Sequence, residues 1–264
     1  MLQNLLASLR FTNLTSNFNQ ITMSDSDKQW KAIYKTGAVT TIIVLLGVFL
    51  DIAVGTITGG NITELPQTAV ERFNQFKETP LLGLYNLDLL NIINQIILIP
   101  SIFALYAAHR ETNKSSAQLS MMLFLVGTTI FVAGNTALSM LDLSHKYFAT
   151  SSTEQKMLLS AAGEAMLVKG SHGSLGVFIG FALPTFANMI MSFVMLNGKV
   201  FSRATSYFGI AGNSLMVIYL IMVTFMPAVE KMALAFAMPG GLLLMGWMIM
   251  FTIKLFKLSK YKVN

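Results

Sequence analysis

Long apolar stretches alternate with short polar segments along the chain after residue 35. A helix needs roughly 20 apolar residues to cross the ~30 Å hydrocarbon core of a bilayer. Stretches of this length recur along the chain, close enough together to form one helical bundle. The pattern therefore predicts an all-α, polytopic transmembrane helical bundle with six spans, at about residues 36–57, 83–108, 118–141, 173–196, 207–228 and 239–258.

A single transmembrane domain accounts for most of the chain, and we place it at residues 28–258. Residues 1–27 are rich in Asn, Gln, Ser and Thr, which predicts a disordered polar leader. Met23 precedes a polar Ser-Asp-Ser-Asp-Lys segment and is an alternative start to Met1. Residues 259–264 form a short basic tail, which we expect on the cytoplasmic side.

Composition narrows the class of protein. The chain is 54% hydrophobic and 11% charged, whereas soluble domains carry about 25% charged residues, so an ordinary soluble globule is excluded. The net charge of +6 does not indicate nucleic acid, because no basic stripe is interleaved with aromatic residues. The basic residues lie beside the spans, which predicts contact with anionic lipid headgroups at the cytoplasmic face. The absence of cysteine excludes disulfides and thiolate metal sites.

The distribution of Lys and Arg predicts the orientation of the spans, because cytoplasmic loops carry an excess of these residues. Six of the 18 basic residues fall on one side of the predicted bundle: Arg72, Lys77, Lys146, Lys156, Lys169 and Lys231. The other twelve fall on the side that holds both ends of the chain. Both termini are therefore predicted to be cytoplasmic.

The two long outer loops carry helical patterns of their own. In the first, Pro66 can begin a helix whose apolar residues share one face, namely Ala69, Val70, Phe73 and Phe76. In the second, Ser151 and Glu154 have capping-box spacing and precede an apolar stripe at Leu158, Ala161, Ala162 and Ala165. These patterns predict short amphipathic helices that lie on the outer membrane interface.

Polar residues inside spans are the strongest indication of a site, because a charge near the bilayer centre costs about 2.5 to 3.5 kcal/mol or more. Asp51 and Asp88 lie in the outer thirds of spans one and two, and Asn135 lies at a similar depth in span three. Asn91 and Gln95 follow Asp88 at i+3 and i+7 and share its helical face. The five residues predict a polar pocket for a ligand or ion in the outer half of the bundle. In the alternative interpretation they only join helices by hydrogen bonds.

Span four carries a row of mostly small and polar residues at four-residue steps. The row contains Gly176, Gly180, Pro184 and Asn188. Small residues at this spacing let helices approach closely, so we interpret these four as helix-packing residues. Gly47 and Gly55 flank Asp51 at the same spacing and predict a close neighbour for span one.

Histidines supply a second candidate site on the outer side. His145 and His172, with Asp142 and Glu164, offer a ligand set of the kind that zinc prefers. The separation of the two histidines matches no ligand spacing, and interfacial hydrogen bonding is the simpler role. His109 stands beside Arg110 at a span end and is expected to face solvent or headgroups. No nucleotide-binding or hydrolase motif occurs, so no cofactor is indicated.

Three stretches resemble a family of proteins: Tyr85-Asn-Leu-Asp-Leu-Leu-Asn91, Phe131-Val-Ala-Gly-Asn135 and Gly170-Ser-His-Gly-Ser-Leu-Gly176. They are similar to a prokaryotic domain-of-unknown-function family of small six-span integral membrane proteins. The resemblance covers about residues 30–258. It implies a multi-pass protein of the bacterial or archaeal cytoplasmic membrane and carries no activity to transfer.

Three functions fit these patterns. The leading hypothesis is a non-enzymatic membrane protein that transports or senses a small solute or ion through the outer-half polar pocket. The first alternative is a metal-dependent membrane enzyme that acts on a lipid-like substrate at the outer interface. The second alternative is a membrane scaffold or partner subunit, in which the polar span residues only join helices.

Overall fold

The computed structural model describes residues 29–55, 66–171, 173–226 and 230–260, and all regular structure in these ranges is helical. The predicted leader and His172 lie outside the described residues. In chain order, the helices are a first helix Gln29–Gly55, α2 Ala69–Glu78, α3 Pro80–Tyr85, α4 Leu89–Ile97, α5 Ile99–His109, α6 Lys114–Gly134, α7 Ala137–Ala149, α8 Thr153–Gly170, α9 Leu175–Gly198, α10 Arg203–Phe225 and α11 Glu230–Lys260.

Six helical stretches among the described residues are long and apolar enough to cross a membrane, which confirms the predicted all-α bundle of six spans. The helix bounds differ from the predicted ones where polar residues extend or interrupt a helix. The third predicted span breaks at Asn135, whose backbone is extended. The sixth begins earlier, at Glu230, because α11 continues through Pro239.

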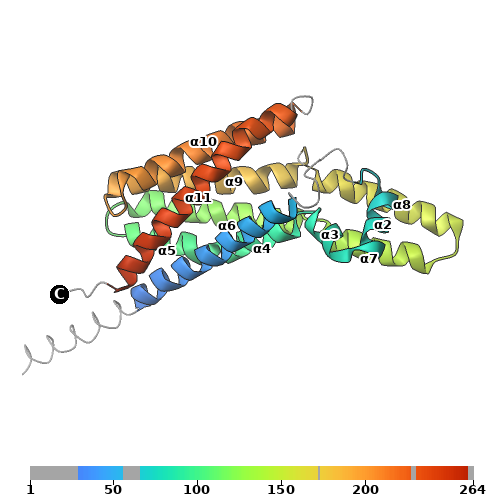
Figure 1. Ribbon diagram of the computed structural model, residues 1–264, viewed down its shortest axis with the longest axis horizontal. Helices are drawn as coiled ribbons and strands as arrows, with labels where there is room; N and C mark the ends of the chain where they lie inside the picture. The colour runs from blue at the N-terminus through green and yellow to red at the C-terminus, as the bar shows by residue number, and fades with distance from the viewer. Residues whose placement is uncertain (1–28, 56–65, 172, 227–229, 261–264) are drawn as a thin grey trace, which may run out of the picture.

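The bundle is held together by close contacts between α6 and α9, and by α10, which packs against both α9 and α11 (Figure 1). Glycine permits the approach of α6 to α9, since a Cβ on Gly180 would lie 2.9 Å from the Cα of Phe131. A Cβ on Gly127 would overlap the ring of Pro184. Large apolar side chains fill the remaining space, among them the fully buried Phe124, Met191, Trp247 and Phe251.

Helices α2, α3, α7 and α8 form an extension at one end of the bundle (Figure 1). The α6–α7 stretch has 36 residues and the α8–α9 stretch has 46; at 1.5 Å per residue both exceed the ~30 Å of a bilayer core. Helix α2 packs on α7 and α8, and the extension has its own small core of Ala69, Phe73, Phe76 and Met140.

The extension differs in part from the predicted interfacial helices. Helix α2 begins at Ala69 rather than at Pro66, and its buried face contains three of the four predicted residues, Ala69, Phe73 and Phe76, with Arg72 in place of Val70. Helix α8 is capped by Ser152 rather than Ser151. It pairs with α7 and turns Gly163 toward α2, while the predicted stripe that begins at Leu158 is exposed.

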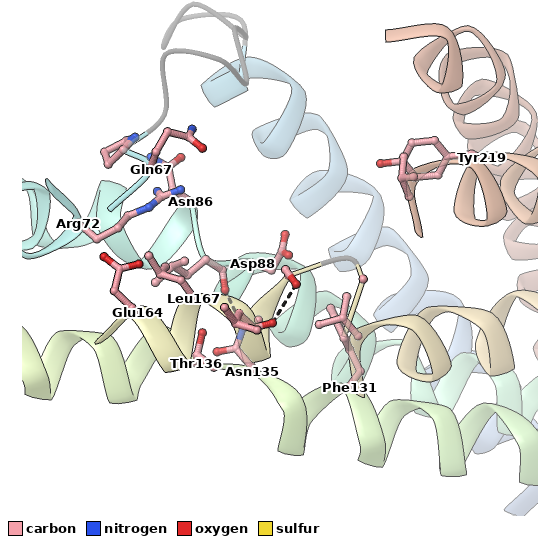
Figure 2. Close-up of a pocket in the computed structure, with 18 residues that line it drawn as sticks. Gln67, Arg72, Asn86, Asp88, Phe131, Asn135, Thr136, Glu164, Leu167 and Tyr219 are labelled. Atoms are coloured by element: carbon pink, nitrogen blue, oxygen red, sulfur yellow. Dashed lines mark hydrogen bonds between the residues drawn. The ribbon is translucent and has the colours of Figure 1, made fainter. Parts of the chain in front are cut away.

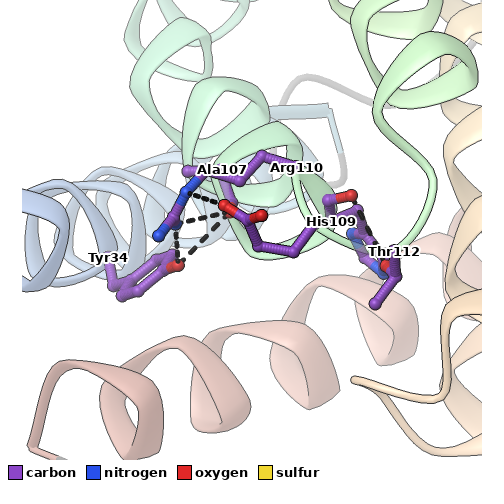
Figure 3. A network of polar contacts seen from close by, with 6 residues as sticks. Tyr34, Ala107, His109, Arg110 and Thr112 are labelled. Carbon is purple, nitrogen blue, oxygen red and sulfur yellow. Dashed lines mark hydrogen bonds and ion pairs between the residues drawn. The ribbon is translucent and has the colours of Figure 1, made fainter. Parts of the chain in front are cut away.

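At the opposite end of the bundle, Arg110 joins the first helix to α5 (Figure 3). Its Nη1 donates to the hydroxyl of Tyr34 at 3.1 Å and to the carbonyl of Ala107 at 3.0 Å, and its guanidinium lies 4.2 Å from the ring centre of Trp30. His109 is fully buried and stacks on Phe201. The expectation of an exposed His109 is therefore wrong, because its side chain turns inward, away from Arg110. Figure 1 shows the first helix beginning and α11 ending at this same end.

Candidate functional site

Two interruptions in the helices place polar groups where the extension meets the bundle. Between α3 and α4, Asp88 adopts a left-handed backbone conformation with φ 63°. Between α6 and α7, Asn135 is extended; its Nδ2 donates to the carbonyl of Leu87 at 2.6 Å and its Oδ1 accepts from the amide of Ala137 at 2.9 Å. Asn135 therefore ties the two interruptions together, and both ends of its amide are occupied.

A cavity of about 500 Å³ lies inside the bundle next to these interruptions, and we call it the bundle cavity. Four of the five residues predicted for a polar pocket line it: Asp51, Asp88, Asn91 and Gln95. Aromatic and sulfur-containing side chains supply much of the remaining wall, including Phe181, Tyr219, Met245 and Trp247. Carboxylates, amides and aromatic rings on one cavity suit a small polar or cationic guest.

Asp51 and Asp88, the two acidic residues of the bundle cavity, both lie near Tyr85 of α3. Helix α3 lies outside the candidate spans. The Tyr85 hydroxyl donates to the backbone carbonyl of Asp51 at 3.0 Å. Burial, followed by the influence of Asp51 and then Asp88, raises the pKa of Tyr85 to about 12. Tyr85 is therefore neutral at physiological pH. Asp51 belongs to the first helix, and Asp88 lies in the break that follows α3. Asn91 donates to the Asp88 carboxylate at 3.1 Å and fixes its direction.

Two amides on the bundle cavity have buried polar atoms that find no hydrogen-bond partner among the described residues. Asn94 is 8% exposed, and its Nδ2 finds no hydrogen-bond partner; the same holds for the Oδ1 of Asn188. A buried polar atom left unpaired costs about 1 to 3 kcal/mol. A donor and an acceptor are thus both open to a guest that carries complementary groups.

A second, more polar cavity of about 710 Å³ lies between the extension and the bundle, and we call it the junction chamber (Figure 2). Asn135 lines this chamber and not the bundle cavity, which separates it from the other predicted pocket residues. The two cavities share Asp88, Phe131 and Tyr219 in their walls. They are therefore neighbours, joined at the break between α3 and α4.

The sequence of this chain matches the model of one family over residues 36–252, and that family is described as a domain of unknown function (DUF4386). The chain belongs to the DUF4386 family. No curated protein and no solved structure matches it. The match reaches all six apolar helices, so this DUF4386 chain is a multi-pass integral membrane protein. The resemblance stated from the three sequence stretches is confirmed.

The structure describes three of the four candidate metal ligands of the DUF4386 chain, Asp142, His145 and Glu164, and does not gather them into a metal site. Asp142 accepts from Lys146 at 2.6 Å on the exposed side of α7. Glu164 accepts from the backbone amide of Ala69 at 2.7 Å and so caps α2. No group of three or more His, Asp or Glu residues suited to a metal occurs among the described residues, and His172 lies outside them.

The predicted packing residues of this DUF4386 chain divide between two positions. Gly176, Gly180 and Pro184 face α6, where the Cα of Gly134 would lie 3.7 Å from a Cβ on Gly176. Asn188 instead lines the bundle cavity. Asn94 was missed by the sequence analysis, although it follows Asn91 at i+3 and this spacing could have placed it on the same face.

Proposed function

We propose that this DUF4386 protein transports or senses a small solute or ion that binds in the bundle cavity. One observation carries the proposal: two carboxylates, Asp51 and Asp88, share a cavity with an open donor on Asn94 and an open acceptor on Asn188. The carboxylates favour a positively charged guest. The amides can then complete its coordination or hydrogen bonding.

The energetic cost of this cavity supports a binding role over a purely structural one. Acidic groups and unpaired amide atoms inside a bundle reduce its stability, and packing alone would be served better by apolar side chains. In a scaffold or subunit, the interhelical polar groups would be expected to satisfy each other, as Ser101 and Thr41 do at 2.9 Å.

Thermal unfolding of the purified full chain tests the proposal. Na⁺, K⁺ and tetramethylammonium chlorides are compared with N-methylglucamine chloride at equal concentration, in an uncharged detergent. A guest at 100 times its Kd stabilises by about 2.7 kcal/mol, which corresponds to a rise in Tm of roughly 5 to 10 °C. We expect at least one of the three cations to give such a rise.

Variants of the carboxylates decide where the cation binds. D51N and D88N should each reduce the rise in Tm, and the double variant should abolish it. D142N is the matched control, because Asp142 is exposed and lies outside both cavity walls. No rise in the wild type, or a rise that survives in the double variant, contradicts the proposal. Uptake of the stabilising cation into proteoliposomes then separates transport from sensing.

We also propose that the protein resides in a prokaryotic cytoplasmic membrane with both termini in the cytoplasm, where its basic residues contact anionic headgroups. The uneven distribution of Lys and Arg supports this orientation. The chain lacks cysteine, so a single Ser259→Cys variant reports one position without interference. A membrane-impermeant maleimide should label it only after the cells are opened, and labelling of intact cells would reverse the orientation.

A further inference from the structure

Arg72 is a buried arginine on the otherwise apolar face of α2. It lies on the buried face of the helix together with Ala69, Phe73 and Phe76, and its exposure is 8%. It also stands near the N-terminus of α2, where the positive end of the helix dipole disfavours a cation. Burial lowers the pKa of Arg72, yet a guanidinium stays charged at physiological pH. A buried charge of this kind needs a partner.

The described residues supply Arg72 with one weak hydrogen bond and with the electrostatic influence of Glu71. Its Nη1 donates to the neutral side-chain oxygen of Gln75 at 3.3 Å, and its buried Nε has no hydrogen-bond partner. Within the described ranges, the ion pairs are Arg110–Glu111 and Lys146–Asp142, so Arg72 belongs to none. A guanidinium offers five N–H donors, and most of those of Arg72 remain available.

Two carboxylates near Arg72, those of Glu71 and Glu164, accept hydrogen bonds from backbone amides. Glu71 accepts from the amides of Gln67 and Thr68 at 2.7 and 3.0 Å, and its side chain faces solvent. Glu164 of α8 accepts from the amide of Ala69. Both carboxylates therefore stabilise the start of α2. Neither forms an ion pair with the guanidinium.

Arg72 lines the junction chamber, and Figure 2 shows its side chain extending toward Asn86. Other neutral polar residues also line the chamber, including Gln67, Thr136 and Ser171, and the Ser171 hydroxyl donates to the carbonyl of Val168. Asp88 also lines the chamber, but it belongs at the same time to the wall of the bundle cavity and accepts from Asn91. The chamber wall thus carries a cation that belongs to no ion pair among the described residues, neutral polar groups, and the carboxylates of Asp88 and Glu164, which accept hydrogen bonds from other residues.

We propose that the junction chamber binds an oxyanion, either a carboxylate or a phosphate group, on the guanidinium of Arg72. These groups accept two parallel N–H bonds from arginine. They would occupy the Nε that has no partner and compensate the buried charge. The chamber lies where the extension meets the bundle, so the oxyanion can come from a free solute or from a lipid headgroup. This site does not depend on a guest in the bundle cavity.

Two measurements on the full chain test the oxyanion site and identify its source. In uncharged detergent, Tm is followed against inorganic phosphate and against acetate, with KCl at matched ionic strength as the reference. In nanodiscs, Tm in pure phosphatidylcholine is compared with Tm in a mixture with anionic phosphatidylglycerol. A rise with the free ions indicates a soluble oxyanion, and a rise only with phosphatidylglycerol indicates a headgroup.

Variants of Arg72 connect the response to the chamber. Loss of a charge-assisted hydrogen bond weakens binding about tenfold to a hundredfold, so R72Q should lose the rise in Tm, whereas R72K should keep part of it. R203Q is the matched control, because Arg203 is exposed at the start of α10. The D51N variant should retain the rise, because Asp51 lines only the bundle cavity, and this separates the two sites.

Two outcomes overturn the proposal. One is a wild type that responds to neither free ion nor to phosphatidylglycerol beyond its reference. The other is a response that R72Q shares fully with the wild type and R203Q. If R72Q fails to fold, the phosphate titration of the wild type still tests whether the protein binds an oxyanion.

Discussion

Gly47 of the first helix provides a sharp test of the geometry of the bundle cavity. A Cβ at this position would overlap the side-chain oxygen of Asn94 and would lie 2.8 Å from its Cγ and Nδ2. The Gly47→Ala change therefore forces the Asn94 amide to move. Because Asn94 is 8% exposed and lines the cavity, its most accessible direction is into the cavity, where it would compete with a guest.

The expected magnitude follows from two opposing effects. Overpacking of a well-filled interior costs about 1 to 3 kcal/mol, while alanine is favoured over glycine in a helix by about 1 kcal/mol. Gly47→Ala should thus lower the free energy of unfolding by about 0 to 2 kcal/mol. In an Asn94→Ala background the overlap disappears, and the same change should instead stabilise by about 1 kcal/mol.

Unfolding by SDS in mixed micelles measures these free energies as a double-mutant cycle. The coupling between Gly47→Ala and Asn94→Ala should reach about 1 to 3 kcal/mol. Gly241→Ala is the control, because Gly241 lines the same cavity and a Cβ there would meet no atom within 4 Å. A coupling below about 0.5 kcal/mol, or equal effects of Gly47→Ala and Gly241→Ala, would refute the close contact with Asn94.

Changes at three further positions test local geometry by the same unfolding measurement. Asp88→Ala should cost about 1 to 2 kcal/mol because of the left-handed backbone, whereas Asp88→Asn, which tolerates that conformation, should cost less; equal losses would contradict this reasoning. Lys199 caps α9 with φ 55°, so Lys199→Gly should stabilise by about 1 kcal/mol, and a loss would count against it. Hydrogen bonds from the amides of Thr68 and then Gln67 lower the pKa of Glu71 below its ordinary 4.5. The stabilisation that Glu71 provides should therefore be complete above pH ~4.5 and disappear as the pH falls through its lower pKa in the folded state. A difference in unfolding free energy between wild type and Glu71→Gln that persists in strong acid would argue against the cap.

The spans and part of the cavity wall could be predicted because both depend on local spacing. Apolar stretches of sufficient length determine the six helices. Asp88, Asn91 and Gln95 share a face through the 3.6-residue period, and the structure places all three on one cavity with Asp51. Such spacing does not determine which helices pack together, so it could not predict that Asn135 lines the junction chamber and not the bundle cavity.

Buried polar residues were harder to predict, because their sequence neighbours suggested exposure. His109 precedes the charged Arg110, yet it follows Leu105 by one helical turn and shares its buried face. Arg72 stands between Glu71 and Phe73, yet its spacing from Ala69 and Phe76 matches the apolar face of α2. In both cases the helical period indicates the buried face correctly.

Both cavities have the same structural origin, namely interrupted helices at the junction of extension and bundle. An interruption frees backbone groups that need partners, and Asn135 supplies them to the carbonyl of Leu87 and the amide of Ala137. The same interruptions turn Asp88, Asn86 and Thr136 toward the junction chamber. Because Asp88 belongs to both walls and begins α4 in a constrained backbone conformation, a guest that moves Asp88 in one cavity must also change the wall of the other. The two proposed sites are therefore coupled through Asp88, although the binding of each guest can be measured separately.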